Sequence, residues 1–211
     1  MGTYQKGVMG AFSGTIGTVI GGSWRDIDYM RSLPTKRKRT PTDKQLDQQA
    51  RFAAVVKFLS GMATLLETGF KQYAVRMSGY NSALSYNIQN AVTGRYPDYS
   101  IDYSNALVSR GKLLNAADPK ATATGDTVFF TWTDNSDGEN TKPDDAAILV
   151  VYCEALENTI YTLNGGTRSA GAGNIKVAVF KGNRVQTWLA FISADGLLTS
   201  NSVYTGELSV G

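Results

Sequence analysis

The sequence predicts an α+β fold in three parts: an N-terminal glycine-rich β-hairpin arm, a central helical segment and a C-terminal antiparallel β-sandwich. Three observations predict it. Glycine punctuates a β-branched stretch at the N-terminus, apolar residues then recur at helical spacing up to about residue 92, and after Pro97 short alternating runs are separated by turn-forming clusters. We expect an arm and helical domain at 1–114, a polar linker at 115–126 and the sandwich at 127–211.

The N-terminal arm combines glycine with two β-prone runs, Thr15–Ile20 and Ile27–Arg31. We expect these runs to pair as a hairpin that turns in the Gly21-Gly22 and Arg25-Asp26 region. Glycines spaced by three and four residues would also fit one face of a helix, but glycine is a poor helix former in water, which favours strands. Glycine at this density permits close backbone approach, so we expect the arm to dock on a neighbour. The expected contact residues are Gly10, Gly14, Gly17, Gly21, Gly22 and Trp24.

A cationic block follows the arm and forms a predicted loop. Residues 1–95 hold 13 Lys/Arg and 5 Asp/Glu, whereas residues 96–211 hold 8 and 13, so the net charges are +8 and −5. This split indicates either a basic face for nucleic acid or head-to-tail contact between unlike surfaces. The alternatives for the block itself are phosphate contacts, a solvated loop, or pairing with an acidic neighbour. The interacting residues would be Arg31, Lys36, Arg37, Lys38, Arg39 and Lys44.

Three helices are predicted in the centre of the chain. Thr40 is a good N-cap and Pro41 suits a first helical position, which predicts a helix to about Leu59. A second helical stretch reaches about Phe70, and a third covers Asn81–Val92 with Gly94 as its C-terminal stop. The buried face of the first helix should hold Leu46, Ala50, Ala53, Val56 and Leu59.

The C-terminal part predicts a series of short strands. Ser100–Ser104 and Ala106–Gly111 are expected to form two strands, or a strand and a turn, and six more strands follow after the linker. Phe129 and Thr131 alternate with Phe130 and Trp132, as expected for a strand of such a sandwich, and we expect Trp188 to fill the core between two sheets. The six strands are Thr127–Thr133, Ala146–Glu154, Thr159–Leu163, Asn174–Val179, Gln186–Ser193 and Ser202–Ser209.

The composition excludes several kinds of active site. The chain has no histidine and one cysteine, Cys153, so it cannot form a Cys–His nucleophile pair or an intrachain disulfide. Cys153 lies in an apolar run and is expected to be a buried core thiol. We expect no catalytic residue, no cofactor and no metal ligand set. The acidic loop from Asp134 to Asp145 reads as a polar turn, although calcium binding and contact with the basic block of an adjacent copy stay open.

Targeting signals are weak. No apolar core with a small-residue cleavage site follows Met1, and no apolar run of 18 residues exists. We therefore expect no signal peptide and no membrane span, and a place in a virion or the cytoplasm.

Two resemblances add to this interpretation. The C-terminal part resembles a fibronectin type III or immunoglobulin-like module, on the stretches Phe130–Trp132, Asp145–Tyr152 and Val185–Phe191. Most of the chain resembles a family of proteins of unknown function found in Bacteroidota and their phages. The residues that carry this resemblance lie at 10–24, 27–34, 42–46 with Arg51-Phe52, 69–71 and 104–111. It implies a bacterial or phage context and brings no catalytic residues.

These observations favour a non-enzymatic structural or assembly protein. The resemblance to proteins of Bacteroidota and their phages implies a more specific role, that of a virion component (head, neck or tail decoration). We expect such a protein to bind copies of itself or other structural subunits, as a homo-oligomer or as part of a larger assembly. The alternatives are a nucleic-acid-associated protein that binds through Arg31 and Lys36–Arg39, and a carbohydrate- or surface-binding module that uses the sandwich loops.

Overall fold

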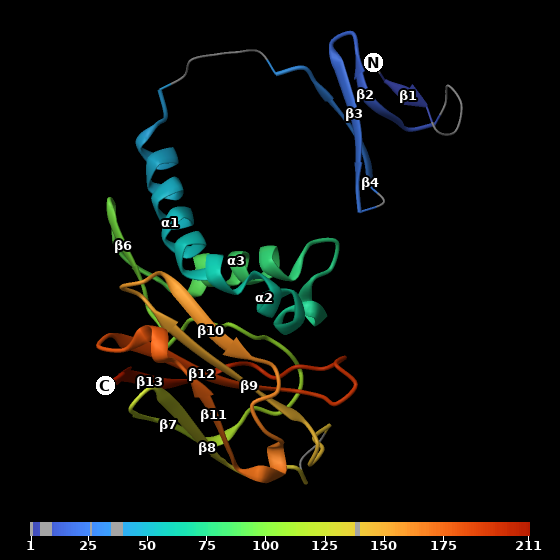
Figure 1. The fold of residues 1–211 in the computed structure, drawn as a ribbon. Helices are drawn as coiled ribbons and strands as arrows, with labels where there is room; N and C mark the ends of the chain where they lie inside the picture. The colour runs from blue at the N-terminus through green and yellow to red at the C-terminus, as the bar shows by residue number, and fades with distance from the viewer. Residues whose placement is uncertain (1, 5–9, 26, 35–39, 138–139) are drawn as a thin grey trace. The chain divides into compact units, whose positions relative to one another are not determined.

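The chain divides into two compact units in the computed structural model, which describes residues 2–4, 10–25, 27–34, 40–137 and 140–211. The N-terminal unit covers Met1–Thr42 and the main unit covers Asp43–Gly211. The expected boundary near residue 114 is therefore not where the contacts separate. The reason is that the central helices pack onto the C-terminal sheets and belong to the same unit (Figure 1).

The N-terminal unit is an antiparallel sheet in the order β1-β2-β3-β4. Strands rather than a glycine-faced helix form this arm, as predicted. The turn is partly where it was predicted: β3 and β4 pair up to Trp24 and Ile27, which flank the expected Arg25-Asp26 position, whereas Gly21 and Gly22 lie inside a strand and pair with Met30 and Tyr29. A further reversal at Gly17-Thr18 divides the run Thr15–Ile20, which was expected to form one strand. The strands are β1 (Thr3–Tyr4), β2 (Phe12–Ile16), β3 (Val19–Trp24) and β4 (Ile27–Ser32).

The helices of the main unit follow the predicted order. The first helix buries Val55, Phe58 and Leu59, whereas Ala53 is exposed and Leu46 is half-buried, because its C-terminal half is the part that meets the sheets. Gly94 does not end the third helix. It lies in a short hairpin with φ +97°. The helical elements are α1 (Asp43–Leu59), α2 (Ala63–Gly69) and α3 (Gly79–Asn90), with 3₁₀ turns η1 (Ser60–Met62) and η2 (Lys71–Tyr73).

The strands of the main unit form two larger sheets and one hairpin, all antiparallel. The four-stranded sheet has the order β10-β9-β12-β13, the three-stranded sheet has the order β11-β8-β7, and β5 pairs with β6. Mixed helix and antiparallel sheet confirm the α+β class. The strands are β5 (Val92–Arg95), β6 (Asp98–Ile101), β7 (Ala117–Thr124), β8 (Thr127–Thr133), β9 (Ala146–Cys153), β10 (Asn158–Thr162), β11 (Ala172–Lys176), β12 (Arg184–Ile192) and β13 (Val203–Ser209), with 3₁₀ turns η3 (Arg168–Ala170) and η4 (Ala178–Phe180).

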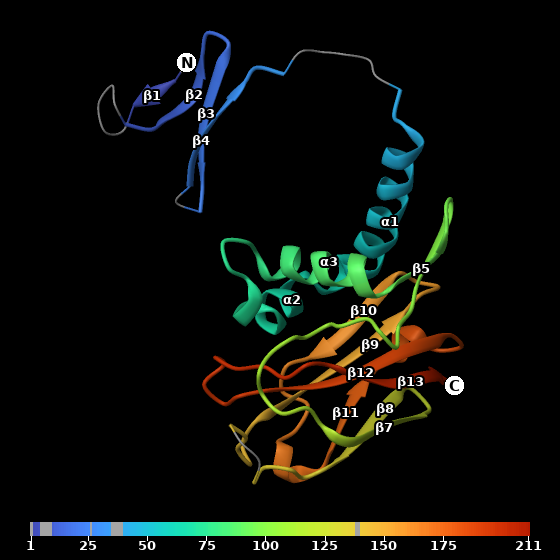
Figure 2. The same ribbon diagram turned by 180° about the vertical axis from the view of Figure 1, so that it is seen from behind.

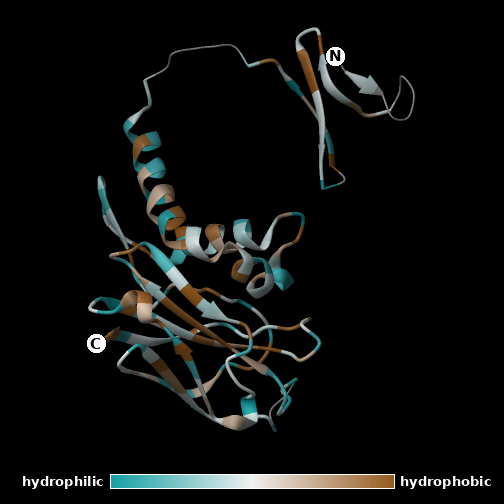
Figure 3. Ribbon diagram, in the orientation of Figure 1, coloured by the Kyte–Doolittle hydropathy of each residue, from teal (hydrophilic) through white to brown (hydrophobic). Residues whose placement is uncertain are grey.

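The four-stranded sheet is buried on both faces. Ile148, Val150 and Tyr152 of β9 join a core with the helices, and Leu149 and Val151 join a second core with the three-stranded sheet. The continuous apolar sequence of β9 follows from this arrangement, since a strand covered on both faces has no polar side. Figure 3 shows the hydrophobic residues concentrated along these central strands and on the helices that cover them.

Trp188 is buried, but not between the two sheets as expected. It lies on the helical face of β12, where its ring centroid is 5.8 Å from that of Phe58 and 5.5 Å from that of Tyr204. The core between the sheets is filled instead by Trp132, Phe130, Phe180 and Phe191 together with aliphatic side chains.

The segment from residue 102 to 116 has no regular structure. Of the segments Ser100–Ser104 and Ala106–Gly111, expected as two strands or as a strand and a turn, only Ser100 and Ile101 lie in a strand, β6. The backbone hydrogen bonds of the segment from residue 102 to 116 go to side chains and loops instead. Arg110 N donates to Gly69 O, and Val108 N donates to Ser202 Oγ. Figure 2 shows this green segment running from β6 to β7. The linker expected at 115–126 is also wrong, because Ala117–Thr124 forms β7.

One helical stretch, Asp43–Gly69, is long and apolar enough by length and composition to cross a membrane. Its apolar face is the part that packs in the helix–sheet core, through Phe58, Met62, Leu65 and Leu66, all at most 1% exposed. Packing onto the sheet therefore accounts for the apolar composition of this stretch.

Candidate functional site: the N-terminal sheet

Large apolar side chains are half-exposed on both faces of the N-terminal sheet. Opposite residues of paired strands lie on the same face, and successive residues alternate. The pairs Gly21–Met30 and Ile16–Val19 therefore share one face, and Trp24–Ile27 belongs to the other. Met30 is 72% exposed and Trp24 is 49% exposed. Two-sided apolar exposure is unusual for a sheet, because sheets are stable when at least one face packs on another layer.

Glycine lets aromatic side chains lie flat against this sheet. A Cβ on Gly21 would stand 2.3 Å from Phe12 O and 2.7 Å from the Phe12 ring, and a Cβ on Gly22 would stand 3.0 Å from the Tyr29 hydroxyl. Side chains at these two positions would force the neighbouring strand or ring away. Gly14 and Gly17 have φ of 106° and 59°, which also favours glycine. Four of the six contact residues predicted in the arm are therefore glycines that the backbone conformation or the close packing requires. They are Gly14, Gly17, Gly21 and Gly22.

A shallow hollow of about 270 Å³ lies on the face that carries Met30. Its lining includes Gly10, which precedes β2, Phe12 at the start of β2, and Asp28 and Met30 from β4. Because Phe12 lines the hollow, a partner side chain could enter it beside the Phe12 ring.

The outer strand β4 has a free edge. One side of β4 pairs with β3, from the residue pair Val19 and Ser32 to the pair Trp24 and Ile27. No strand among the described residues pairs with the other side. All of its residues are exposed. An uncovered edge of this kind exposes backbone N–H and C=O groups that can pair with another chain.

The predicted basic residues are only partly placed. Arg31 is exposed on β4 opposite Ile20, on the face that also carries Tyr29 and Trp24. Lys44 is exposed in the first turn of α1. Lys36, Arg37, Lys38 and Arg39 lie outside the described residues. Sequence reasoning missed Ile27, Tyr29 and Met30 as surface residues, although their alternation along the strand carried the signal.

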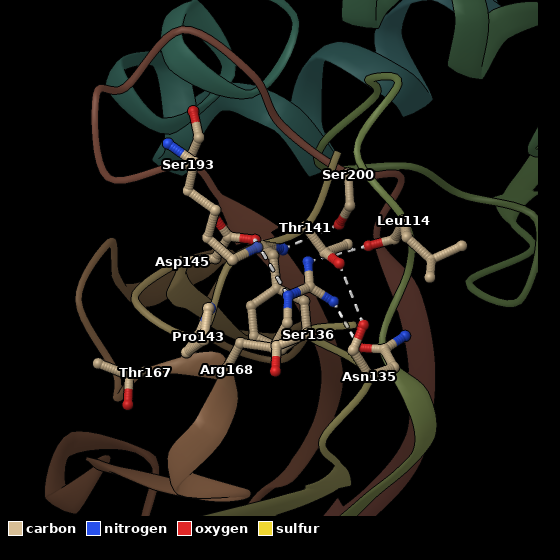
Figure 4. Close-up of polar contacts among 12 residues, drawn as sticks. Leu114, Asn135, Ser136, Thr141, Pro143, Asp145, Thr167, Arg168, Ser193 and Ser200 are labelled. Carbon is tan, nitrogen blue, oxygen red and sulfur yellow. Dashed lines mark hydrogen bonds and ion pairs between the residues drawn. The ribbon is translucent and has the colours of Figure 1, made fainter. Parts of the chain in front are cut away.

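A second charged cluster lies inside the main unit, around Arg168 (Figure 4). The Arg168 side chain is fully buried, and its Nε donates to Asp145 Oδ2 at 3.1 Å. The two terminal nitrogens donate to Asn135 Oδ1 at 2.6 Å and to Leu114 O at 3.1 Å. The guanidinium carbon lies 3.9 Å from the centre of the Phe191 ring. Burial lowers the pKa of Arg168, and the bond to Asp145 opposes that shift.

The hydrogen bonds of Arg168 connect four segments of the main unit, so this cluster has a structural role. Asp145 was expected to lie in an exposed acidic loop, but its Oδ2 also accepts from Lys142 N at 3.0 Å, and its side chain is buried. Asp145 therefore pairs within its own chain. Among the residues that the structure describes, no group of three or more His, Cys, Asp or Glu side chains gathers as a metal site. Cys153 is a buried free thiol, as predicted.

The chemistry of the N-terminal sheet is that of a contact surface. It presents apolar area, ring faces, a free strand edge and cationic side chains, all of which can bind another macromolecule.

Comparison with known proteins gives one match. A family model described as a family of unknown function (DUF6266) matches residues 11–206. No curated protein and no solved structure matches. Since the match covers both the N-terminal sheet and nearly all of the main unit, the chain belongs to this family of unknown function.

Proposed function

We propose that this protein is a non-enzymatic assembly subunit that docks on neighbouring copies of itself through its N-terminal sheet. The observation that carries the proposal is the exposure of large apolar side chains on both faces of that sheet, led by Met30 and Trp24. A virion subunit is the specific case that the resemblance to proteins of Bacteroidota and their phages suggests.

The N-terminal sheet needs a covering layer. A sheet this small buries too little of its own surface to be stable alone, and both hydrophobic core clusters of the described residues belong to the main unit. A second surface laid on Val19 and Met30, or on Trp24 and Ile27, would supply the missing layer. The free edge of β4 would let a neighbouring strand extend the sheet at the same time.

Charge supports a copy of the same chain as the partner. Residues 1–42 hold seven Lys/Arg and two Asp/Glu, a net charge of +5, whereas residues 43–211 hold 14 and 16, a net charge of −2. The N-terminal unit of one copy is therefore attracted to the main unit of another. Head-to-tail contacts of this kind build rings or filaments rather than closed pairs.

We propose that the two larger sheets form a fibronectin type III-like sandwich. Taken in chain order from β7 to β13, the first, second and fifth strands form one sheet, and the third, fourth, sixth and seventh form the other. In the immunoglobulin constant arrangement the fourth strand pairs in the first sheet. Here β10 pairs with β9 instead, which favours the fibronectin type III variant.

The test measures the solution mass of the full chain by light scattering over a range of concentrations. We expect a mass several times that of one chain, and a single-chain mass after removal of residues 1–42, which leaves both core clusters intact. Met30→Glu should have the same effect as the truncation. A matched control is Val179→Glu, which changes a 68% exposed apolar residue of the main unit and should leave the mass unchanged.

The basic residues separate assembly from nucleic-acid binding. If Lys36–Arg39 serve assembly, replacing them with Gln should lower the oligomer mass, since the +5 charge falls to +1. If the oligomer survives while affinity for DNA and its salt dependence collapse, the nucleic-acid alternative holds instead.

A further inference from the structure

Arg110 of the main unit is held between two tyrosine rings. Its guanidinium carbon lies 4.2 Å from the centre of the Tyr73 ring and 5.0 Å from that of the Tyr86 ring. The backbone is fixed as well, because Arg110 N donates to Gly69 O at 2.9 Å and Arg110 O accepts from Thr199 Oγ1 at 3.3 Å. The cation is therefore pre-positioned rather than free to swing into solvent.

This cation has no anionic partner among the described residues, because no carboxylate lies within ion-pair distance of it. The acidic groups of the surrounding elements are engaged elsewhere. Glu67 of α2 accepts from Gly79 N and Tyr80 N at the start of α3. Asp102 accepts from Ser104 and Asn105, which lowers its pKa.

A hollow of about 380 Å³ opens at Arg110 and is lined largely by polar side chains. Ser82 and Asn90, on its wall, already bond to backbone carbonyls. Ser85 and Gln89 also line it, and their side chains make no hydrogen bond to the described residues. The guanidinium, a hydroxyl and an amide thus border one hollow that holds no acidic side chain.

We propose that this hollow binds a small oxyanion, a carboxylate or phosphate group, through Arg110 with support from Ser85 and Gln89. The N–H donors of a guanidinium match the paired oxygens of such groups. A sugar ring or a nucleobase fits less well, because it would stack on the ring faces of Tyr73 and Tyr86 that the guanidinium already occupies. The site lies within the main unit, so its test does not depend on assembly through the N-terminal sheet.

The experiment titrates the full chain with inorganic phosphate and, separately, with acetate, and follows the Arg110 side-chain N–H resonance by NMR together with heats of binding. We expect saturable shifts with at least one probe. A response to phosphate alone would identify phosphate-bearing ligands, and a response to acetate alone would identify carboxylates. No response to either probe at tens of millimolar would overturn the proposal.

Two variants and a control keep the test specific. Arg110→Gln should weaken binding at least about tenfold, a loss of about 1.4 kcal/mol or more. Gln89→Glu keeps Arg110 but places a carboxylate in the hollow, so it should abolish anion binding without lowering the unfolding temperature. Arg95→Gln removes the same charge from an exposed hairpin position and should bind as the unchanged protein does. Equal binding by Gln89→Glu and the unchanged protein would contradict the proposal.

Discussion

Replacing Arg168 with Met should destabilise the main unit strongly. The substitution removes the guanidinium that pairs with Asp145, whose side chain is 1% exposed, and leaves a buried carboxylate without its counter-charge. Breaking a buried ion pair from one side costs about 3–5 kcal/mol, because the remaining charge stays desolvated. The carbonyl of Leu114 and the side-chain oxygen of Asn135 lose their donors too, which adds to the same loss.

The size of the effect can be stated as a shift in unfolding temperature. For a domain of this size, each kcal/mol corresponds to about 2–4 °C, so Arg168→Met should lower the midpoint by roughly 6–20 °C. Urea unfolding followed by tryptophan fluorescence measures the free energy directly, since Trp132 Nε1 donates to Arg168 O at 2.8 Å and reports on this cluster.

Two further variants isolate the cause. Arg168→Met combined with Asp145→Leu removes both charges and should recover part of the lost stability, because no buried ion is left unpaired. Arg184→Met breaks the exposed pair with Glu207, whose side chains are 77% and 46% exposed, and should cost at most about 1 kcal/mol. A loss below about 1 kcal/mol for Arg168→Met itself would refute the reasoning, since it would show that water reaches Asp145.

Three other variants test the packing, the charge state and the arm. Phe58→Ala should lower the free energy of unfolding by about 3–5 kcal/mol in urea, because Phe58 fills the core beside Trp188. Burial raises the pKa of Tyr152 to about 12, above the pKa of about 10 that it has in an unfolded chain. The stability that Tyr152 contributes is therefore complete below about pH 10 and is lost as the pH rises through about 12. Tyr152→Phe should therefore flatten the alkaline fall of the unfolding temperature. Gly21→Val should abolish assembly in light scattering while the unfolding temperature of the main unit stays the same, since the new side chain collides with Phe12.

Most strand positions in the C-terminal part could be predicted from the sequence, and the errors have physical causes. Five of the six strands predicted after residue 126 match β8, β9, β10, β12 and β13 within about two residues, because turn clusters bound them. The sixth, β11, begins two residues and ends three residues earlier than the predicted Asn174–Val179. β7 was missed because its inward residues, such as Ala121 and Ala123, are too small to give an apolar pattern. The face of Trp188 was not predictable, since a strand buried on both sides has no polar side to set its direction.

The sequence predicted that the arm forms a contact surface, but it did not predict which residues contact one another. Glycine density indicated close approach in the arm, and Gly21 makes it, but Gly21 and Gly22 lie inside a strand, and a further turn that was not predicted lies at Gly17-Thr18. The pair between Asp145 and Arg168 joins residues 23 apart in sequence, and no local pattern signals it. The same holds for Arg110 and its two tyrosines, which come from separate segments brought together by packing.

The most direct test of the central claim measures the accessibility of Trp24 in the full chain. Trp24 is 49% exposed in the single chain, whereas Trp132 and Trp188 are 6% and 0% exposed, so acrylamide quenching of fluorescence reports mainly on the N-terminal sheet. If neighbouring copies cover the face of this sheet that carries Trp24 and Ile27, quenching should fall as protein concentration rises, and Ile27→Glu, on the same face, should remove that dependence. Equal quenching of the unchanged chain at all concentrations would contradict docking through the Trp24 face of the N-terminal sheet.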